Sequence, residues 1–346
     1  MSKVRTAIVG LGMAVKPHAE SYLELADRVE VAYAFSPSEA RRRVFAQQYP
    51  FRLVDSFNQI LEDDSVHFVS ILTPPNTHLE LVRRCAAAGK HVLLEKPLEI
   101  NFNRAVALID TCEQAGVKLG VVLQHRFRPS GERLRALLAD RALGRIVGAS
   151  VSVLNWRPQS YYDQPGRGDK DRDGGGVLIT QGIHTLDLFL SLVGLPKELF
   201  AYAGTTAIHE METEDLVSGC MQFDDGAIGT ICATTAAYPG FPESISIIGE
   251  AGTADIVGTS LVVRYLDGGQ EKLAPDGSGG GAGADPMDFP NDYHRALIAD
   301  FVEAIERDQQ PRITGREALK VHRFIACILK SANKNCPVTV GNVDQT

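Results

Sequence analysis

The stretch VRTAIVGLGMAV at residues 4–15 decides the class of fold. Residues 4–9 form a short apolar run that ends at Gly10, which is typical of a buried strand in a parallel sheet. The turn Gly10-Leu11-Gly12-Met13-Ala14 follows, and a helical pattern begins behind it. A strand, a glycine turn and a helix in this order favour a dinucleotide-binding motif. The third small residue of the motif would be Val15, or Ala14 after a slip of one residue, so the match is imperfect. A merely tight strand-to-helix turn is the alternative.

Strands and helices alternate regularly beyond this turn. At this spacing they predict right-handed crossover units and a parallel sheet. We therefore expect an α/β, Rossmann-type domain over residues 1–125 that binds NAD(P). Its further strands are expected at 29–35, 66–73, 91–96 and 118–126, and its helices at 17–26, 37–49, 77–89 and 101–116.

The regular alternation of strands and helices ends in the second part of the chain. Several strand-like stretches between 197 and 265 are joined by tight turns, which indicates a largely antiparallel sheet. We expect an α+β domain with an open sheet over residues 126–346, which would bind substrate and form oligomers. Its other expected elements are helices at 129–140, 177–194, 292–308 and 315–332, a long strand at 144–158 and a polar loop at 159–176.

The composition narrows the function classes. The 346 residues carry 35 Lys and Arg against 43 Asp and Glu, a formal charge of −8. This balance argues against a nucleic-acid partner, because phosphate contacts need clustered basic side chains. No apolar run approaches the ~18 residues of a membrane helix, and no signal-peptide region precedes the first strand. The six cysteines form no C-x-x-C pair and the nine histidines show no paired spacing. We therefore expect free thiols, no metal and a cytoplasmic location.

The end of the second strand bears on the choice of cofactor. In this class an acidic residue there usually binds the adenosine 2′-hydroxyl, but the strand ends in Ala34-Phe35-Ser36-Pro37-Ser38. Ser36 and Ser38, helped by Arg41 or Arg42, could bind a 2′-phosphate instead. We therefore expect NAD or NADP with a lean towards NADP. A solvated helix face is the alternative for the two arginines.

Polar residues also follow the later strands. Ligands of α/β sheets bind at the carboxyl ends of the strands, and Lys96 there could orient a substrate hydroxyl close to a nicotinamide. The expected cofactor contacts at these ends are Thr73, Pro74, Pro75, Asn76, His78, Glu95, Lys96 and Gln124.

Segments along nearly the whole chain resemble the Gfo/Idh/MocA family of glucose–fructose oxidoreductase and inositol dehydrogenase. They are the Gly10-x-Gly12 turn, TPPNTH at 73–78, AGKHVLLEKPLE at 88–99, Gln124-x-Arg126-Phe127-x-Pro129, GGGVLITQGIHTLDL at 174–188, GEAGTADI at 249–256 and DFVEAIERDQQPRITGREAL at 300–319. The resemblance implies an NAD(P)-dependent oxidoreductase acting on a sugar or polyol.

The resemblance also implies the catalytic residues. Lys96 matches the lysine that contacts substrate and nicotinamide, and its charge would stabilise a developing alkoxide. His184 matches the general acid/base, and an imidazole titrates near neutrality as that task requires. The glycine run 174–176 would bring a flexible backbone beside it. Asp187 would orient the site. Thr180 completes the candidate catalytic set, although the family often has Asp or Asn at its position.

A branch of the family is suggested by Tyr161-Tyr162, Gly166-Arg167-Gly168 and Asp173-Gly174-Gly175-Gly176. This pattern is similar to enzymes that oxidise nucleotide sugars such as UDP-N-acetylglucosaminuronate at C3, although Gly166 replaces the usual Trp. Arginines could hold a carboxylate or phosphate in bidentate geometry, or simply face solvent. The expected substrate contacts are Arg126, Arg157, Tyr162, Arg167, Gln181 and His184.

Other functions stay open from the sequence. Simple polyol oxidation or aldose and ketose reduction would suit the same fold. A non-catalytic NAD(P)-binding regulator would be expected to lose Lys96 or His184, and both are present. By family analogy we expect a homodimer or homotetramer, with no nucleic-acid or membrane partner.

Overall fold

The computed structural model describes residues 3–277 and 290–341. They divide into two compact units. Unit 1 comprises the described residues up to Gln124 together with Pro290–Leu319, and unit 2 comprises those from His125 onward together with the described residues after Leu319. The expected division left the whole of 126–346 in the second domain. The segment Pro290–Leu319 instead packs with the first unit, because the apolar face of its helix covers that unit's first helix.

Unit 1 contains a six-stranded parallel sheet in the order β3-β2-β1-β4-β5-β6. The central strands are buried on both faces, as a parallel sheet between helices requires. The expected Rossmann-type fold is confirmed. The strands are β1 (Val4–Val9), β2 (Val29–Phe35), β3 (Leu53–Val54), β4 (Phe68–Ile71), β5 (His91–Glu95) and β6 (Leu119–Val122).

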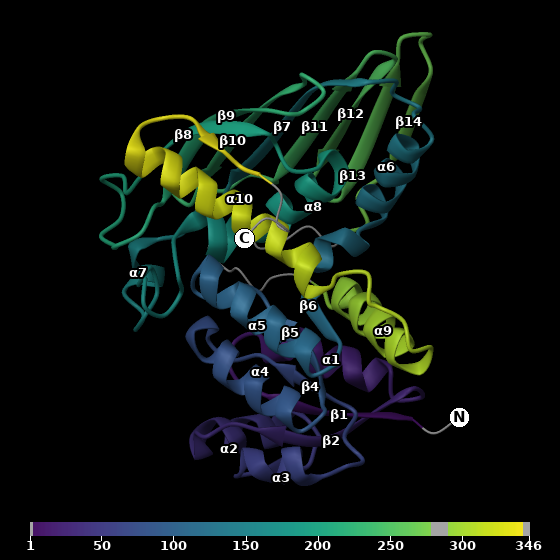
Figure 1. The fold of residues 1–346 in the computed structure, drawn as a ribbon, viewed down its shortest axis with the longest axis vertical. Coiled ribbons are helices and arrows are strands. Elements are labelled where there is room, and N and C mark those ends of the chain that lie inside the picture. The colour runs from purple at the N-terminus through teal and green to yellow at the C-terminus, as the bar shows by residue number, and fades with distance from the viewer. Residues whose placement is uncertain (1–2, 278–289, 342–346) are drawn as a thin grey trace. The chain divides into compact units, whose positions relative to one another are not determined.

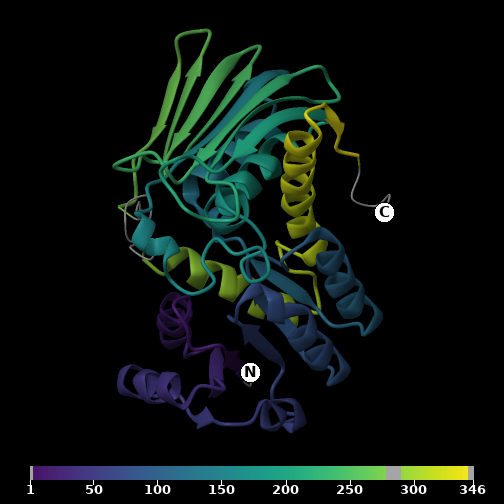
Figure 2. The same cartoon turned by 90° about the vertical axis from the view of Figure 1, so that its left-hand side faces the viewer.

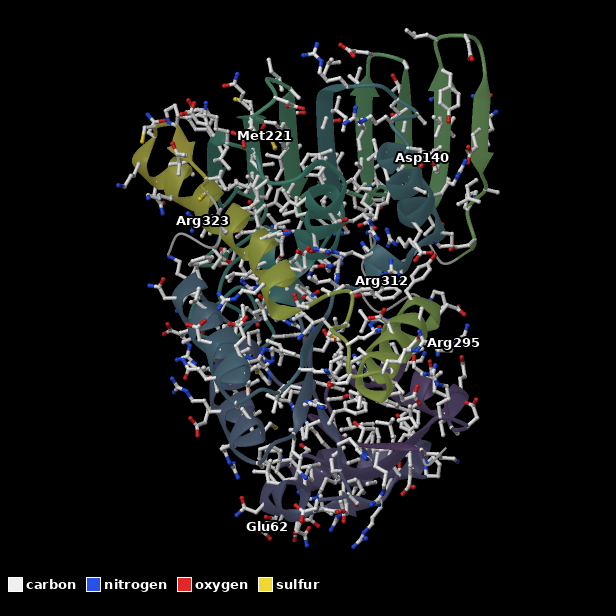
Figure 3. The ribbon with its side chains drawn as sticks, turned by 45° about the vertical axis from the view of Figure 1, so that its right-hand side comes forward. Glu62, Asp140, Met221, Arg295, Arg312 and Arg323 are labelled. Carbon is white, nitrogen blue, oxygen red and sulfur yellow. The ribbon has the colours of Figure 1, made fainter. Side chains whose placement is uncertain are left out.

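The helices of unit 1 pair with one another beside this sheet. Helix α1 packs on α9 and α4 packs on α5, as Figure 1 shows. Arg295 of α9, labelled in Figure 3, forms an ion pair with Glu24 of α1. The helices are α1 (Val15–Glu24), α2 (Glu39–Gln48), α3 (Phe57–Glu62), η1 (Pro75–Thr77), α4 (His78–Ala87), α5 (Phe102–Gln114) and α9 (Asp292–Glu306). Among these, α3 was not expected.

Unit 2 contains a nine-stranded sheet in the order β14-β13-β12-β11-β7-β10-β9-β8-β15. The pair β7 and β10 is parallel and every other pair is antiparallel, so the expected largely antiparallel sheet is confirmed. The strands are β7 (Ile146–Leu154), β8 (Glu198–Gly204), β9 (Leu216–Gln222), β10 (Ile228–Thr234), β11 (Ser244–Gly249), β12 (Gly252–Val257), β13 (Ser260–Tyr265), β14 (Gln270–Leu273) and β15 (Val338–Thr339).

Helices cover one face of this sheet, and the other face is open in Figure 2. Helix α8 packs on β7 and β11, and α6 packs on β12 and β13. Arg323 of α10, labelled in Figure 3, donates to the Val340 carbonyl behind β15. The remaining elements are η2 (Gln124–Phe127), α6 (Pro129–Ala139), α7 (Gln159–Tyr162), the π-turn η3 (Leu178–Gly182), α8 (Ile183–Val193) and α10 (Gly315–Lys334), which contains the division between the units. Within the described residues, none of the helices has the length and hydropathy needed to cross a bilayer.

Candidate active site

The glycine turn after β1 has no room for a side chain. Gly10 has φ of +104°, and a Cβ there would lie 2.7 Å from the Leu72 carbonyl carbon at the end of β4. The Gly10 amide donates to the Phe35 carbonyl at the end of β2. Glycine is required both for the left-handed backbone and for the close approach. The turn is therefore fixed between the ends of two strands.

Helix α1 begins directly behind this turn. In the described part of the chain, no side chain caps its first turn, which also holds no acidic residue. The amide groups of a helix's first turn need an external acceptor, and the helix dipole favours an anion there. Of the expected set, Leu11, Gly12, Met13 and Ala14 lie beside this helix N-terminus, where a pyrophosphate would fit, whereas the Gly10 amide is bonded to the Phe35 carbonyl.

Of the serines and arginines that follow β2, some bond to the backbone of the turn and one arginine faces the glycine turn. Ser36 is buried, and its hydroxyl accepts from the Ser38 amide, while Ser38 caps α2. The Arg42 guanidinium donates to the Ser36 carbonyl at 2.6 Å. The Arg41 guanidinium instead lies 3.9 Å from the position of a Cβ on Gly12. Arg41 is the basic group that faces the glycine turn.

Replacement of Ser36 by Asp is expected to lower the ratio of NADP to NAD affinity. A carboxylate at this strand end would repel a 2′-phosphate and accept from a ribose hydroxyl. Like charges about 4 Å apart near a surface repel by up to about 4 kcal/mol, so a shift of about tenfold or more is expected. Fluorescence titration with NADH and NADPH measures it, with Ser36→Asn as the uncharged control. An unchanged ratio would contradict this use of the position.

The turn after β4 is held by a buried histidine. His78 lies with one ring nitrogen 2.8 Å from the Thr73 carbonyl oxygen and the other 3.0 Å from that of Pro97. It was expected to contact the cofactor, but both ring nitrogens lie against internal carbonyls. His78 therefore ties the turn after β4 to the turn after β5. Thr73 also bonds Thr77, and Pro74, Pro75 and Asn76 form the start of η1.

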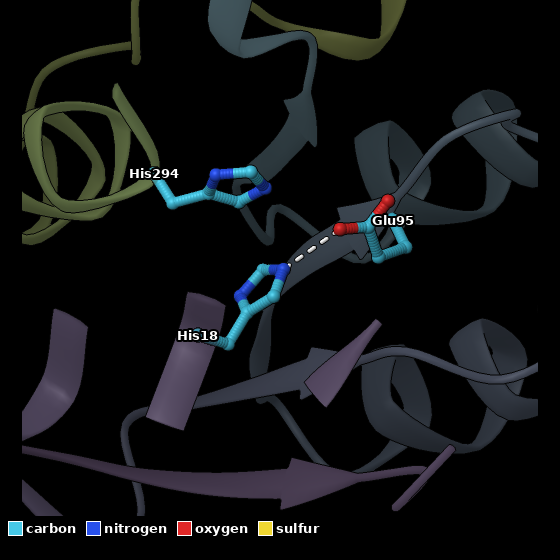
Figure 4. A group of neighbouring side chains, drawn as sticks. All are labelled: His18, Glu95 and His294. Atoms are coloured by element: carbon cyan, nitrogen blue, oxygen red, sulfur yellow. Dashed lines mark hydrogen bonds and ion pairs between the residues drawn. The ribbon is translucent and has the colours of Figure 1, made fainter. Parts of the chain in front are cut away.

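Glu95 and Lys96 follow β5. One oxygen of the buried Glu95 carboxylate accepts from the Lys96 backbone amide at 3.0 Å, and the other lies 2.7 Å from His18 Nε2. Figure 4 shows that His294 lies beside this pair. Glu95 was expected to contact the cofactor, but its carboxylate is engaged inside unit 1. Gln124, expected to contact the cofactor, is buried at the start of η2.

In unit 2, His184 lies at the start of α8, directly after a π-turn. Such turns are rare and often mark functional sites. The backbone of Gly176 packs closely against Glu214, because a Cβ on Gly176 would lie 1.8 Å from the Glu214 carbonyl oxygen. The buried Glu214 carboxylate accepts from the Gly176 and Leu178 amides, and burial raises its pKa. The backbone was expected to be flexible here, but its Gly176 end is bonded to Glu214.

A second imidazole packs against His184. The ring centroids of His125 and His184 are 4.9 Å apart. His125 Nε2 lies 2.7 Å from an Arg128 nitrogen, and Arg128 pairs with Glu243. Glu243 also accepts from the Thr185 hydroxyl at 2.6 Å. This group places His184 between fixed neighbours, and sequence reasoning missed it although His125 adjoins the expected Gln124 and Arg126.

Asp187 forms a buried ion pair one turn further along α8. Arg126 Nε and Nη2 donate to its two oxygens at 2.7 and 2.6 Å. Arg126 was expected to contact substrate, but its guanidinium is engaged with Asp187. The pair fixes the face of α8 that carries His184.

Replacement of Arg126 by Ala is expected to lower the free energy of unfolding by about 3–5 kcal/mol, because it leaves the Asp187 carboxylate buried without its charge partner. Urea denaturation, followed by the intrinsic fluorescence of unit 2, measures this loss of unfolding free energy. Arg133→Ala, which breaks the exposed bidentate pair with Glu271, is the control and should lose little or no stability, because solvent screens an exposed pair. Equally small losses of stability in both variants would show that the buried pair of Arg126 and Asp187 does not stabilise the fold.

The remaining expected residues lie around η3 and α7. The Thr180 hydroxyl donates to the Gly176 carbonyl at 2.7 Å, which occupies its donor and gives it a role in the π-turn. Arg157 is buried, with contacts to the Trp156 carbonyl and the Gln181 side chain at 2.7 Å each. Tyr162 bonds Thr235. Arg167 packs over the Tyr161 ring and is 22% exposed, so it is the arginine of this set that a ligand could reach.

The sheet order of unit 1, its glycine turn and the uncapped α1 define a dinucleotide-binding protein of the Rossmann class. Two family models match the chain. One, described as oxidoreductase family, NAD-binding Rossmann fold, covers residues 4–123, and the GFO/IDH/MocA C-terminal domain covers residues 132–255. The chain belongs to the GFO/IDH/MocA family of oxidoreductases.

Relatives with described activities cover most of the chain. D-xylose 1-dehydrogenase (NADP(+)) 2 of Haloferax volcanii is 29% identical over 89% of this chain and 91% of its own. Myo-inositol 2-dehydrogenase of Thermotoga maritima is 27% identical over 75% of this chain and 78% of its own. The structure of the WlbA dehydrogenase from Bordetella pertussis, in complex with NADH and UDP-GlcNAcA, is 26% identical with a TM-score of 0.84, covering 98% of this chain and 99% of that one.

Proposed function

We propose that this NAD(P)-dependent oxidoreductase transfers hydride between the nicotinamide and a secondary hydroxyl or ketone of a sugar, polyol or nucleotide sugar. The observation that carries the proposal is the fixed His184, which lies in α8 directly after a π-turn and packs against His125. The residues of unit 1 fit a dinucleotide, because the cradle at Gly10 excludes any side chain and, in the described chain, no side chain caps the first turn of α1. When bound, the nicotinamide supplies the hydride acceptor or donor.

The proton and the charge of the reaction are assigned to two residues. His184 takes the proton of the substrate hydroxyl as general base, and returns it during reduction. Lys96 places a positive charge beside the oxygen as alkoxide character develops. Thr180 is left out of the proton path, because its hydroxyl donates to the Gly176 carbonyl. A non-catalytic NAD(P)-binding regulator is the alternative, and such a protein would need neither Lys96 nor His184.

A carboxylated nucleotide sugar is the substrate class that we place first. Arg167 lies over the Tyr161 ring at 5.1 Å and is partly exposed, which suits recognition of a carboxylate or phosphate. The WlbA neighbour binds UDP-GlcNAcA. Gly166 departs from the expected Trp, and its φ of +80° is a backbone conformation that a Trp would rarely adopt. Simple sugars and inositols are therefore the competing substrates.

NADP is the proposed cofactor. Arg41 faces the glycine turn and no acidic residue ends β2 in the described chain. The xylose dehydrogenase relative is named for NADP, whereas the WlbA complex holds NADH.

We propose a homodimer or homotetramer that forms through the open face of the unit 2 sheet. Large apolar side chains lie exposed there, including Tyr202 at 65%, Ile228 at 63% and Ile248 at 48%. Exposed apolar surface of this kind favours association. The six cysteines are free thiols, which supports a reducing compartment, and we propose the cytoplasm.

A nicotinamide-reduction screen tests the proposed function. The protein is incubated with NAD or NADP and with aldoses, inositols and UDP-sugars that carry a carboxylate, and the reduced nicotinamide is followed by absorbance. Turnover with one substrate class is expected. Tight binding of NADH or NADPH without turnover of any substrate would favour the regulator.

A further inference from the structure

Three buried residues from distant parts of the chain meet behind Lys96. His18 lies in α1, Glu95 ends β5 and His294 lies in α9, and all three belong to unit 1 (Figure 4). The rings of His18 and His294 meet edge to face with centroids 5.2 Å apart. The proposed reaction uses none of the three directly. Buried polar side chains are normally hydrogen-bonded within the protein, so this cluster of three calls for a structural or functional role.

The hydrogen bonds define the protonation of the group. The Glu95 carboxylate is an acceptor, so His18 Nε2 donates to it. His18 Nδ1 is buried, and among the described residues it has no hydrogen-bond partner. A proton on Nδ1 would be a buried donor without an acceptor, so the neutral Nε2–H form of His18 fits best.

His294 is neutral as well, because burial lowers its pKa to about 3. Burial would raise the pKa of Glu95, but the hydrogen bond from His18 and the charge of Lys96 lower it. The group is thus an ionised carboxylate between two neutral imidazoles, and the Lys96 ammonium is a positive charge that favours the ionised form of Glu95.

A metal ion is the first alternative for two histidines and a carboxylate. Their ligand atoms lie within 4.8 Å of one another. A divalent ion would have to break the contact of 2.7 Å between His18 and Glu95. With one carboxylate as the anionic ligand, it would also add a net positive charge beside Lys96. Burial of unbalanced charge is strongly unfavourable, so the charges argue against the ion.

We propose that Glu95 is a positioning residue for Lys96, and that His18 joins it to the helix that receives the dinucleotide. This proposal rests on the proposed role of Lys96. Glu95 holds the Lys96 backbone amide with one oxygen, and its negative charge interacts favourably with the charge of Lys96. The other oxygen is bound by His18, the fourth residue of α1, whose N-terminus lies behind the glycine turn. A shift of α1 on nucleotide binding would therefore change the position of Lys96 through His18 and Glu95.

A double-mutant cycle between Glu95 and Lys96 tests the proposal. Glu95→Gln keeps the shape but offers one acceptor oxygen to two donors, so kcat should fall by about tenfold or more. In a Lys96→Ala background the same change should have little further effect on kcat, because the group that Glu95 positions is gone. Losses that multiply independently would overturn the proposal in favour of general structural damage. Full kcat in Glu95→Gln, when Lys96→Ala is impaired, would also overturn it.

His18 provides the matched pair of variants. His18→Gln keeps an N–H donor for Glu95 and should retain most of the wild-type kcat. His18→Leu removes the donor and should behave like Glu95→Gln. Equal kcat in the two His18 variants would overturn the link to α1.

Two measurements decide the matter without enzymatic activity, so that failure of the proposed function is distinguishable. In protein labelled with [13C]lysine, the Lys96 resonance is assigned by its loss in Lys96→Ala and titrated by NMR. Glu95→Gln should lower the pKa of Lys96, because the negative charge that interacts with it is lost, and an unchanged titration overturns the proposal. Native mass spectrometry with added Zn²⁺ should show no stoichiometric ion. An ion bound one to one and lost in His294→Ala would overturn the proposal in favour of a metal site.

Discussion

Replacement of His184 by Ala is expected to lower kcat by about 10²–10⁴, the usual contribution of a general acid or base. The imidazole is the group that we assign to the substrate proton. The fixed surroundings should survive the change, because Arg126 and Asp187 hold α8 independently of the His184 ring. Steady-state kinetics with the substrate found in the screen measure the loss. KM should change less than kcat, since the proton moves only in the transition state.

Two controls sharpen this result. Thr180→Ala should leave kcat near the wild-type value, because its hydroxyl is bonded to the Gly176 carbonyl. His67→Ala removes an exposed histidine of unit 1 and should have no effect on turnover. A His184→Ala enzyme as active as these two would show that the proton leaves by another route.

Replacement of Lys96 by Ala is expected to lower kcat by about 10²–10³, as for removal of one group that stabilises a developing oxyanion. The loss should appear in kcat and in kcat/KM alike, because the alkoxide charge forms only as hydride leaves. Lys96→Arg keeps the charge and should be less impaired, although its guanidinium is planar and donates in a different geometry.

The surroundings of Lys96 make this variant interpretable. Glu95 and His78 fix the backbone of the turn through contacts that do not involve the Lys96 side chain, so Lys96→Ala should keep its fold and its NADH affinity within a few-fold. Lys330→Ala, an exposed lysine of α10, is the control for loss of a charge. Undiminished turnover in Lys96→Ala would remove the lysine from the mechanism.

Local patterns were sufficient to predict the fold. The apolar run at 4–9, the glycine turn and the strand at 29–35 follow from side-chain period and backbone sterics alone, and β1 and β2 agree with them. Helix α3 was missed because its single turn and a half is too short for a period to be recognised. The return of Pro290–Leu319 to unit 1 depends on tertiary packing and has no local signal.

The candidate site divides in the same way. Lys96 and His184 lie in motifs that can be read directly. The partners of Arg126 and Glu95 are distant in sequence, and only the folded chain brings Asp187 and His18 to them. His78, Glu95 and Arg126 were expected to contact cofactor or substrate, but each forms hydrogen bonds to other groups of the protein. No spacing rule would have joined His18 and His294.

The discontinuity of unit 1 has a consequence for the order in which the chain folds during synthesis. The face of α1 that carries His18 and Ser21 is covered by α9, which is made only after strands β7 to β14 of unit 2. At roughly 5–20 residues per second, the ribosome needs on the order of ten seconds or more to pass from the end of β6 to α9. During that time the nascent nucleotide-binding unit exposes an apolar helix face. Unit 1 therefore cannot be completed before strands β7 to β14 of unit 2 have been made, and a chaperone that protects α1 is expected to raise the yield.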